Sequence, residues 1–127
     1  MAQELEILLL GELRVLLNGR DMPLPASKKA RALLAFLVAT GRPHRRERLC
    51  ELLWDLPDDP KAALRWSLSK LRAVVTTGDN RPLVADRMAV QLDCTTLDVD
   101  LAVLRQLAED PSAYALALAR IWEATAG

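Results

Sequence analysis

The chain has 127 residues, of which 51% are hydrophobic, so it is long enough for one domain with a substantial core and short for two. This composition argues against a chain that is disordered over most of its length. The first apolar stretch, residues 5–17, is interrupted by Glu, Gly and Arg and has no cationic segment before it, which argues against a signal peptide or a membrane span there.

Charge is balanced overall but unevenly distributed along the chain. Residues 27–81 hold 12 Lys and Arg against 6 Asp and Glu, a net charge of +6. Residues 1–26 hold 2 against 4 and residues 93–127 hold 2 against 6, net charges of −2 and −4. Positive charge is therefore concentrated in the middle of the chain.

The N-terminal residues are rich in Leu, Ile and Val and predict strands. Residues 5–10 and 12–17 are each expected to form one, and the Asn-Gly pair at 18–19 suits the positive φ angles of a tight hairpin turn. A short third strand is expected near residues 20–24. Pro23 within it and Pro25 just after it cannot donate to a sheet ladder, so this strand should lie at an edge.

Three helices are expected next. The first follows an N-cap at Ser27 and stops at Gly41. The second covers about residues 45–54. The third is capped by Asp59 and has Pro60 at its first position, where a missing N–H is tolerated.

The third helix, residues 60–75, carries four cations and no acidic residue. At about 100° per residue, its apolar side chains fall in one narrow stripe that must be buried, made of Leu64, Leu68, Leu71 and Val75. The opposite face is small, polar and basic, with one Trp. An ordinary exposed helix usually mixes charge signs, so this pattern favours contact with DNA over a merely solvated face.

After the third helix, residues 83–93 predict two short strands around an Asp-Arg turn, a β-hairpin. Helical patterns follow at residues 95–110 and 111–127. Strands, three helices with the third basic, and then a hairpin outline an α+β winged helix. In that fold one helix enters the DNA major groove, and small outward residues allow its close approach.

Several motifs also resemble a known family. They are "SKKARALL" at 27–34, "RERLCELLW" at 46–54 and "LRWSLSKLR" at 64–72, in this order. The chain resembles the N-terminal part of SARP-type regulators (Streptomyces antibiotic regulatory proteins), whose DNA-binding domain is an OmpR-like winged helix-turn-helix. That domain has an N-terminal antiparallel β-platform, three helices and a C-terminal β-hairpin wing, followed by α-helices. "LDVDLAVLRQL" at 97–107 resembles the opening of the bacterial transcriptional activator domain.

The resemblance implies a winged-helix domain at 1–93 and the truncated start of a helical domain at 94–127. It implies sequence-specific DNA binding by a bacterial transcription regulator, with recognition helix 61–75 in the major groove and wing 83–92 on the flanking groove. Two copies head to tail on direct repeats are also expected. RNA polymerase would contact the loop between the second and third helices, where the acidic residues are Asp55, Asp58 and Asp59.

The candidate DNA-binding residues are Lys61, Arg65, Trp66, Ser69, Lys70, Arg72, Arg45, Arg46 and Arg87. Trp66 departs from the family, in which this position is commonly polar or basic. Contact with sugar and a thymine methyl, packing on a partner, and obstruction of close docking all stay open for its indole. His44 could contact a phosphate, but an ordinary surface histidine is the favoured reading.

A competing hypothesis keeps the fold and makes it a protein-interaction or regulatory module of a larger multidomain protein, without DNA binding. The neutral chain and the central Trp66 favour it. The two hypotheses differ in one feature: the cations of the third helix either form one exposed patch with residues 42–48 or are paired off by Glu47, Glu51 and Asp79.

The sequence predicts neither an enzyme nor a cofactor. It contains no Gly-rich phosphate loop and no nucleophile with a His partner in a known motif. Cys50 and Cys94 lie far apart with no second Cys or His at metal-ligand spacing, so two reduced thiols are expected and no metal site. Reduced thiols predict a cytoplasmic protein.

Overall fold

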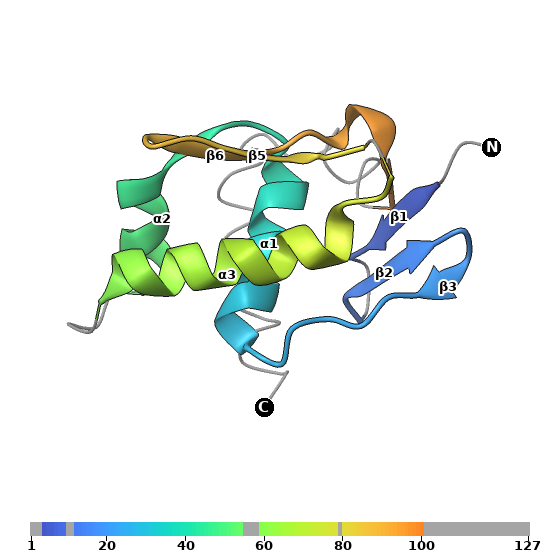
Figure 1. The fold of residues 1–127 in the computed structure, drawn as a ribbon, viewed down its shortest axis with the longest axis horizontal. Helices are drawn as coiled ribbons and strands as arrows, with labels where there is room; N and C mark the ends of the chain where they lie inside the picture. The colour runs from blue at the N-terminus through green and yellow to red at the C-terminus, as the bar shows by residue number, and fades with distance from the viewer. Residues whose placement is uncertain (1–3, 10–11, 55–58, 79, 101–127) are drawn as a thin grey trace.

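The computed structural model describes residues 4–9, 12–54, 59–78 and 80–100. Two small sheets flank three helices (Figure 1). The elements are β1 (Leu5–Leu8), β2 (Arg14–Leu17), β3 (Arg20–Asp21), α1 (Lys28–Thr40), β4 (His44–Arg45), α2 (Arg46–Leu53), α3 (Pro60–Val75), β5 (Leu83–Ala85), β6 (Ala89–Leu92), a 3₁₀ turn at Cys94–Thr96, and β7 (Asp98–Val99). This is the order of a winged helix, with the hairpin β5–β6 as its wing.

The first sheet has the order β3-β2-β1-β7 and forms the N-terminal platform. β2 pairs antiparallel with both β1 and β3. Asn18 and Gly19 have φ angles of 51° and 83° between β2 and β3, the left-handed backbone that the Asn-Gly turn predicted. β3 ends at Asp21, earlier than the expected 20–24, because Pro23 follows closely and cannot extend a ladder.

β7 corrects the helical pattern expected from residue 95. It pairs parallel with β1, and Asp100 accepts a hydrogen bond from the Leu9 amide at 2.7 Å. Residues 98–99 are therefore a strand of the platform and not the first turn of a helix. Residues 101–127, which hold the rest of both predicted helices, lie outside the described part of the chain. The division at 93/94 stays a prediction.

α1 is the central helix. The Ser27 hydroxyl accepts from the Ala30 amide at 3.2 Å, and Gly41 ends the helix with a φ of 62° and a bond from its N–H to Leu37 O, as the sequence predicted. Every residue from Ala32 to Thr40 is buried, because other elements pack on all sides of this part of the helix. α1 is thus the scaffold on which α2, α3 and the wing rest (Figure 1).

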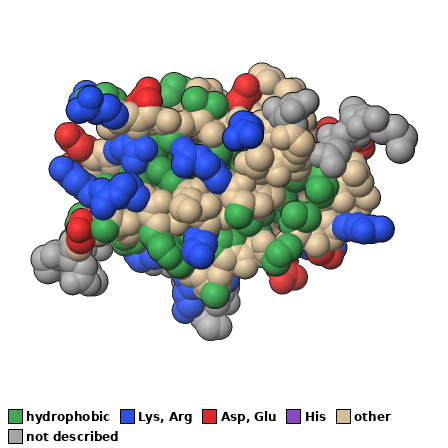
Figure 2. Space-filling model, viewed as in Figure 1, with side chains coloured by type: hydrophobic (Ala, Val, Ile, Leu, Met, Phe, Trp, Pro, Cys, Tyr) green, Lys and Arg blue, Asp and Glu red, His purple; other side chains and the backbone are tan. Residues whose placement is uncertain are grey.

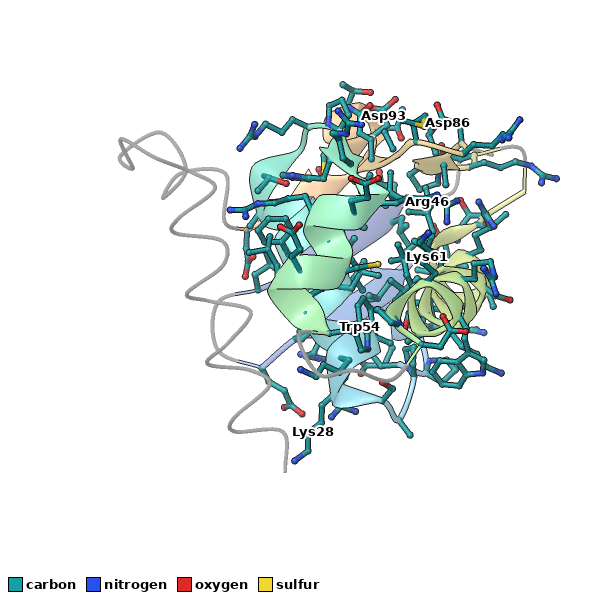
Figure 3. All side chains as sticks on the ribbon, turned by 90° about the vertical axis from the view of Figure 1, so that its left-hand side faces the viewer. Lys28, Arg46, Trp54, Lys61, Asp86 and Asp93 are labelled. Carbon is teal, nitrogen blue, oxygen red and sulfur yellow. The ribbon has the colours of Figure 1, made fainter. Side chains whose placement is uncertain are left out.

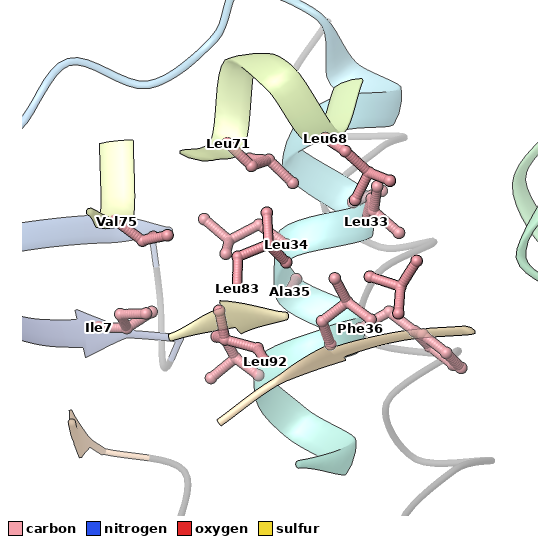
Figure 4. Close-up of a cluster of buried hydrophobic side chains, with 14 of the residues drawn as sticks. Ile7, Leu33, Leu34, Ala35, Phe36, Leu68, Leu71, Val75, Leu83 and Leu92 are labelled. Carbon is pink, nitrogen blue, oxygen red and sulfur yellow. The ribbon is translucent and has the colours of Figure 1, made fainter. Parts of the chain in front are cut away.

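α3 packs its apolar stripe on α1. Figure 4 shows Leu68 and Leu71 pointing toward Leu33 and Leu34 of α1, within a core that also takes in residues of both sheets. The buried face is wider than the predicted stripe, since Ser67 is also buried. Among the described residues, no helix is long and apolar enough to cross a membrane.

Candidate nucleic-acid interface

The outward face of α3 carries most of the candidate residues. Asp59 accepts a hydrogen bond from the Ala62 amide at 3.1 Å and fixes the start of the helix, as predicted. Burial of the leucine stripe then sets which side chains face solvent. The exposed candidates on this helix are Lys61, Arg65, Trp66, Ser69, Lys70 and Arg72. The sequence therefore predicted their exposure correctly.

The cations of α3 are not neutralised by any carboxylate that the structure describes. Within that part of the chain the ion pairs are Arg14 with Asp21 at 2.9 Å, on the platform, and Arg48 with Glu51 at 3.7 Å, within α2. The Glu51 carboxylate thus pairs with an arginine of its own helix and not with a cation of α3. Asp79, the other acid expected to compete, lies outside the described residues. Among the described residues, neither Glu47 nor Glu51 forms an ion pair with a cation of α3.

The patch continues from α3 onto α2. The Cys50 thiol donates to Pro60 O at 3.6 Å and so joins the two helices. Burial raises the pKa of this thiol, while the positive charges of Lys61 and Arg46 act to lower it. Lys61 at the start of α3 and Arg46 at the start of α2 therefore both lie close enough to the Cys50 sulfur to affect its pKa (Figure 3).

The hairpin extends the same surface. β4 pairs with β6, which aligns Arg45 with Ala89, and both Arg45 and Arg87 are exposed. Arg46 is only half-exposed, because its Nε donates to the carbonyl of Asp86 at 2.6 Å. In Figure 2, Lys and Arg side chains gather over the end of the molecule where α2, α3 and the hairpin turn meet.

The hairpin turn is held by its own carboxylate. Asp86 Oδ1 accepts from the amides of Met88 at 2.7 Å and Ala89 at 2.8 Å. These two bonds, first that of Ala89, lower the pKa of Asp86, so the turn keeps a negative charge beside the basic residues. The sequence predicted the turn but not the role of Arg46 beside it.

Trp66 is half-exposed at 50% and has Lys70 beside it. The Lys70 Nζ lies 5.4 Å from the centroid of the Trp66 ring, within cation–π distance. The indole is therefore not part of the core. It is a flat apolar surface on the outward face, with a positive charge at its side.

His44 is buried, which corrects the expectation of a surface histidine. Its Nε2 lies 2.8 Å from the Thr40 hydroxyl, and its ring centroid is 4.6 Å from that of Phe36. Burial lowers its pKa to about 4, helped by the positive charges of Arg42 and Arg48. The ring is thus neutral near pH 7 and faces α1. Its place in the short strand β4, which sequence periodicity did not predict, explains the error.

The loop between α2 and α3 is only partly described. Asp55 and Asp58 lie outside the described residues, and Asp59 uses one carboxylate oxygen as the α3 cap. In the parts of the chain that the structure describes, no three His, Cys, Asp or Glu side chains group so as to hold a metal ion.

No protein-family model and no curated protein matches this chain. Among solved structures, it is similar to that of Mycobacterium tuberculosis EmbR in complex with a low affinity phosphopeptide, with a TM-score of 0.67 and 24% sequence identity. The similarity covers 95% of this chain and 36% of the EmbR chain. At this identity the likeness establishes a shared fold, so the prediction of an α+β winged helix is confirmed.

Proposed function

We propose that this chain is the DNA-binding domain of a cytoplasmic bacterial transcription regulator of the SARP type. α3 enters the major groove, and the hairpin β5–β6 lies on the flanking groove. The observation that carries the proposal is the set of α3 cations, exposed and without an ion-pair partner among the described residues. A duplex supplies the negative charge that this surface lacks.

The residues divide into two roles by their positions. Arg65, Lys70 and Arg72 flank the small outward face of α3, where they reach guanine edges or the phosphates beside them. Arg45 is the last residue of β4, and Arg87 lies in the hairpin turn. Contact of these two side chains with phosphates positions the domain without reading bases. Sequence is thus read by α3, and register is fixed by the wing.

The likeness to EmbR supports the winged-helix fold on which this proposal rests. Because this chain spans only 36% of EmbR, the wider activity is also part of the proposal. It includes two copies head to tail on direct repeats. It also includes a contact of RNA polymerase with the loop that holds Asp55, Asp58 and Asp59.

One observation favours the second candidate, a protein-interaction module. The large apolar side chains exposed on α3 and the hairpin are Trp66 at 50%, Val84 at 55% and Met88 at 59%. Exposed apolar side chains mark contact with another protein where they form one patch. Under this candidate the same helix would dock on a protein surface, and the salt-dependent binding of DNA would be absent.

Selection from a pool of random duplex DNA, at two salt concentrations, tests the proposal. We expect enrichment of a short motif, repeated in one direction, with retention that falls as salt rises. The Arg65→Ala/Lys70→Ala variant should lose the motif. The Arg20→Ala/Lys28→Ala variant removes the same charge from exposed positions on β3 and α1 and should keep it. If wild type enriches nothing and shows no salt-sensitive retention, the DNA proposal fails and the protein-interaction module takes its place.

A further inference from the structure

The strands of the hairpin β5–β6 are anchored in the core, and the turn between them lies outside it. Val90 and Leu92 of β6 and Leu83 of β5 are buried in the core. Beyond them the turn extends above α2 (Figure 1), and residues 86–88 are exposed. Figure 3 shows Arg46 between this turn, marked by Asp86, and the body of α2.

Two hydrogen bonds from Arg46 join the hairpin turn to the start of α2. The Arg46 side chain donates through Nε to Asp86 O at 2.6 Å, and the Arg46 main-chain amide donates to Met88 O at 2.9 Å. The two acceptors lie on either side of Arg87. Arg46 was expected to contact DNA, but its Nε–H is already used within the protein.

We propose that Arg46 is a positioning residue that fixes the direction of the wing relative to α2. The turn is internally rigid, because Asp86 holds the amides of Met88 and Ala89. Arg46 therefore orients it as one piece, with Arg87 at its tip.

The consequence for DNA rests on the proposed function. With the turn fixed to α2, Arg45 and Arg87 form one rigid surface. The wing then binds the flanking groove without an entropic cost of ordering it. Without the tether, the same cations remain but the wing must be ordered on binding, which weakens the complex.

Three substitutions separate the hydrogen bond from the charge. In Arg46→Gln the amide nitrogen lies as many bonds from Cα as the arginine Nε, so a donor is kept and the charge is lost. In Arg46→Lys the charge is kept, but a methylene replaces the donor at that position. Arg46→Met keeps an unbranched apolar stem and loses both.

Amide hydrogen exchange of the free protein is the first readout, and it does not depend on DNA. We expect the Arg46 main-chain amide to exchange about tenfold faster in Arg46→Lys and Arg46→Met, and at the wild-type rate in Arg46→Gln. The Asp86 amide is the internal control. It donates to Ala89 O within the turn at 3.0 Å and should exchange alike in all four proteins.

The second readout is the hydroxyl-radical footprint on a selected duplex. We expect Arg46→Gln to keep protection of the flanking groove despite its lost charge, and Arg46→Lys to lose it while major-groove protection persists. The reverse result, protection kept in Arg46→Lys and lost in Arg46→Gln, would overturn the proposal and make Arg46 a phosphate contact. Unchanged exchange in all variants would overturn the tether itself. If wild type gives no footprint, DNA binding fails, and exchange still decides the tether.

Discussion

Arg65 is one of the α3 cations proposed to contact DNA. It is exposed on α3 with no described carboxylate at ion-pair distance, so its charge is available to a ligand. We expect Arg65→Ala to weaken binding of a selected duplex by about 1 to 3 kcal/mol if Arg65 contacts a guanine. Titration of a labelled duplex measures this, with Arg20→Ala as the matched control. Equal affinities of Arg65→Ala and wild type would remove Arg65 from the interface.

His44 predicts how stability depends on pH. Its pKa is about 4 in the folded protein, below the usual 6.5, so the unfolded chain binds the proton more readily. Its contribution to stability is complete above pH 6.5 and is lost as the pH falls from 6.5 toward 4.

We therefore expect the free energy of unfolding of wild type to fall by roughly 2 kcal/mol more than that of His44→Gln between pH 7 and pH 5. Denaturant titration at the two pH values measures this difference. Below pH 5 the carboxylates also titrate, so the comparison stops there. Parallel pH profiles for the two proteins would contradict the buried, neutral His44.

For single residues, the sequence predicted exposure correctly on α3, where helix periodicity applies. It did not predict the contacts of His44 and Arg46. The exposure of Lys61, Arg65 and Lys70 follows from the leucine stripe of α3. The burial of His44 and the tether of Arg46 depend on β4 pairing with β6, some 40 residues away in the chain. No local pattern carries such a contact.

At the scale of elements, helix caps determine where the interface begins. The Asp59 carboxylate accepts from the Ala62 amide at the start of α3. We expect Asp59→Ala to lower the free energy of unfolding by about 1 kcal/mol and Asp59→Asn to change it little, because asparagine caps as well as aspartate. Denaturant titration of both variants tests this. Equal losses in the two would mean that the charge of Asp59, and not its cap, stabilises the helix.

The Asp59→Asn variant also separates capping from the proposed contact with RNA polymerase. It keeps the cap and removes one negative charge from the loop. If that contact uses Asp59, transcription from a target promoter should fall in Asp59→Asn while DNA affinity stays at the wild-type value. Unchanged transcription would exclude Asp59 from the contact.

The elements themselves were predicted best where capping and turn residues mark their ends. Ser27, Gly41, Asp59 and the Asn-Gly turn fixed boundaries that the structure confirms. β7 was missed because its parallel pairing with β1 joins residues at opposite ends of the described chain. Its residues follow a helical pattern locally, and tertiary pairing overrides that preference.

At the scale of the whole molecule, a neutral chain can still bind a polyanion because its charges are segregated. The excess of 12 basic over 6 acidic residues falls in residues 27–81, which contribute α1, α2 and α3. The packing of these helices, with the hairpin beside them, gathers cations on one end of the molecule (Figure 2). Overall net charge is therefore a poor guide to the partner.

The salt dependence of binding to a selected duplex tests whether the cations of α3 bind DNA. Each phosphate neutralised steepens the plot of log K against log salt by about 0.9. We expect a steep negative slope for wild type and the Arg20→Ala/Lys28→Ala control. For Arg65→Ala/Lys70→Ala we expect a slope about 1 to 2 flatter, with lower affinity. Equal slopes and affinities in all three proteins would show that the exposed cations of α3 take no part in binding DNA.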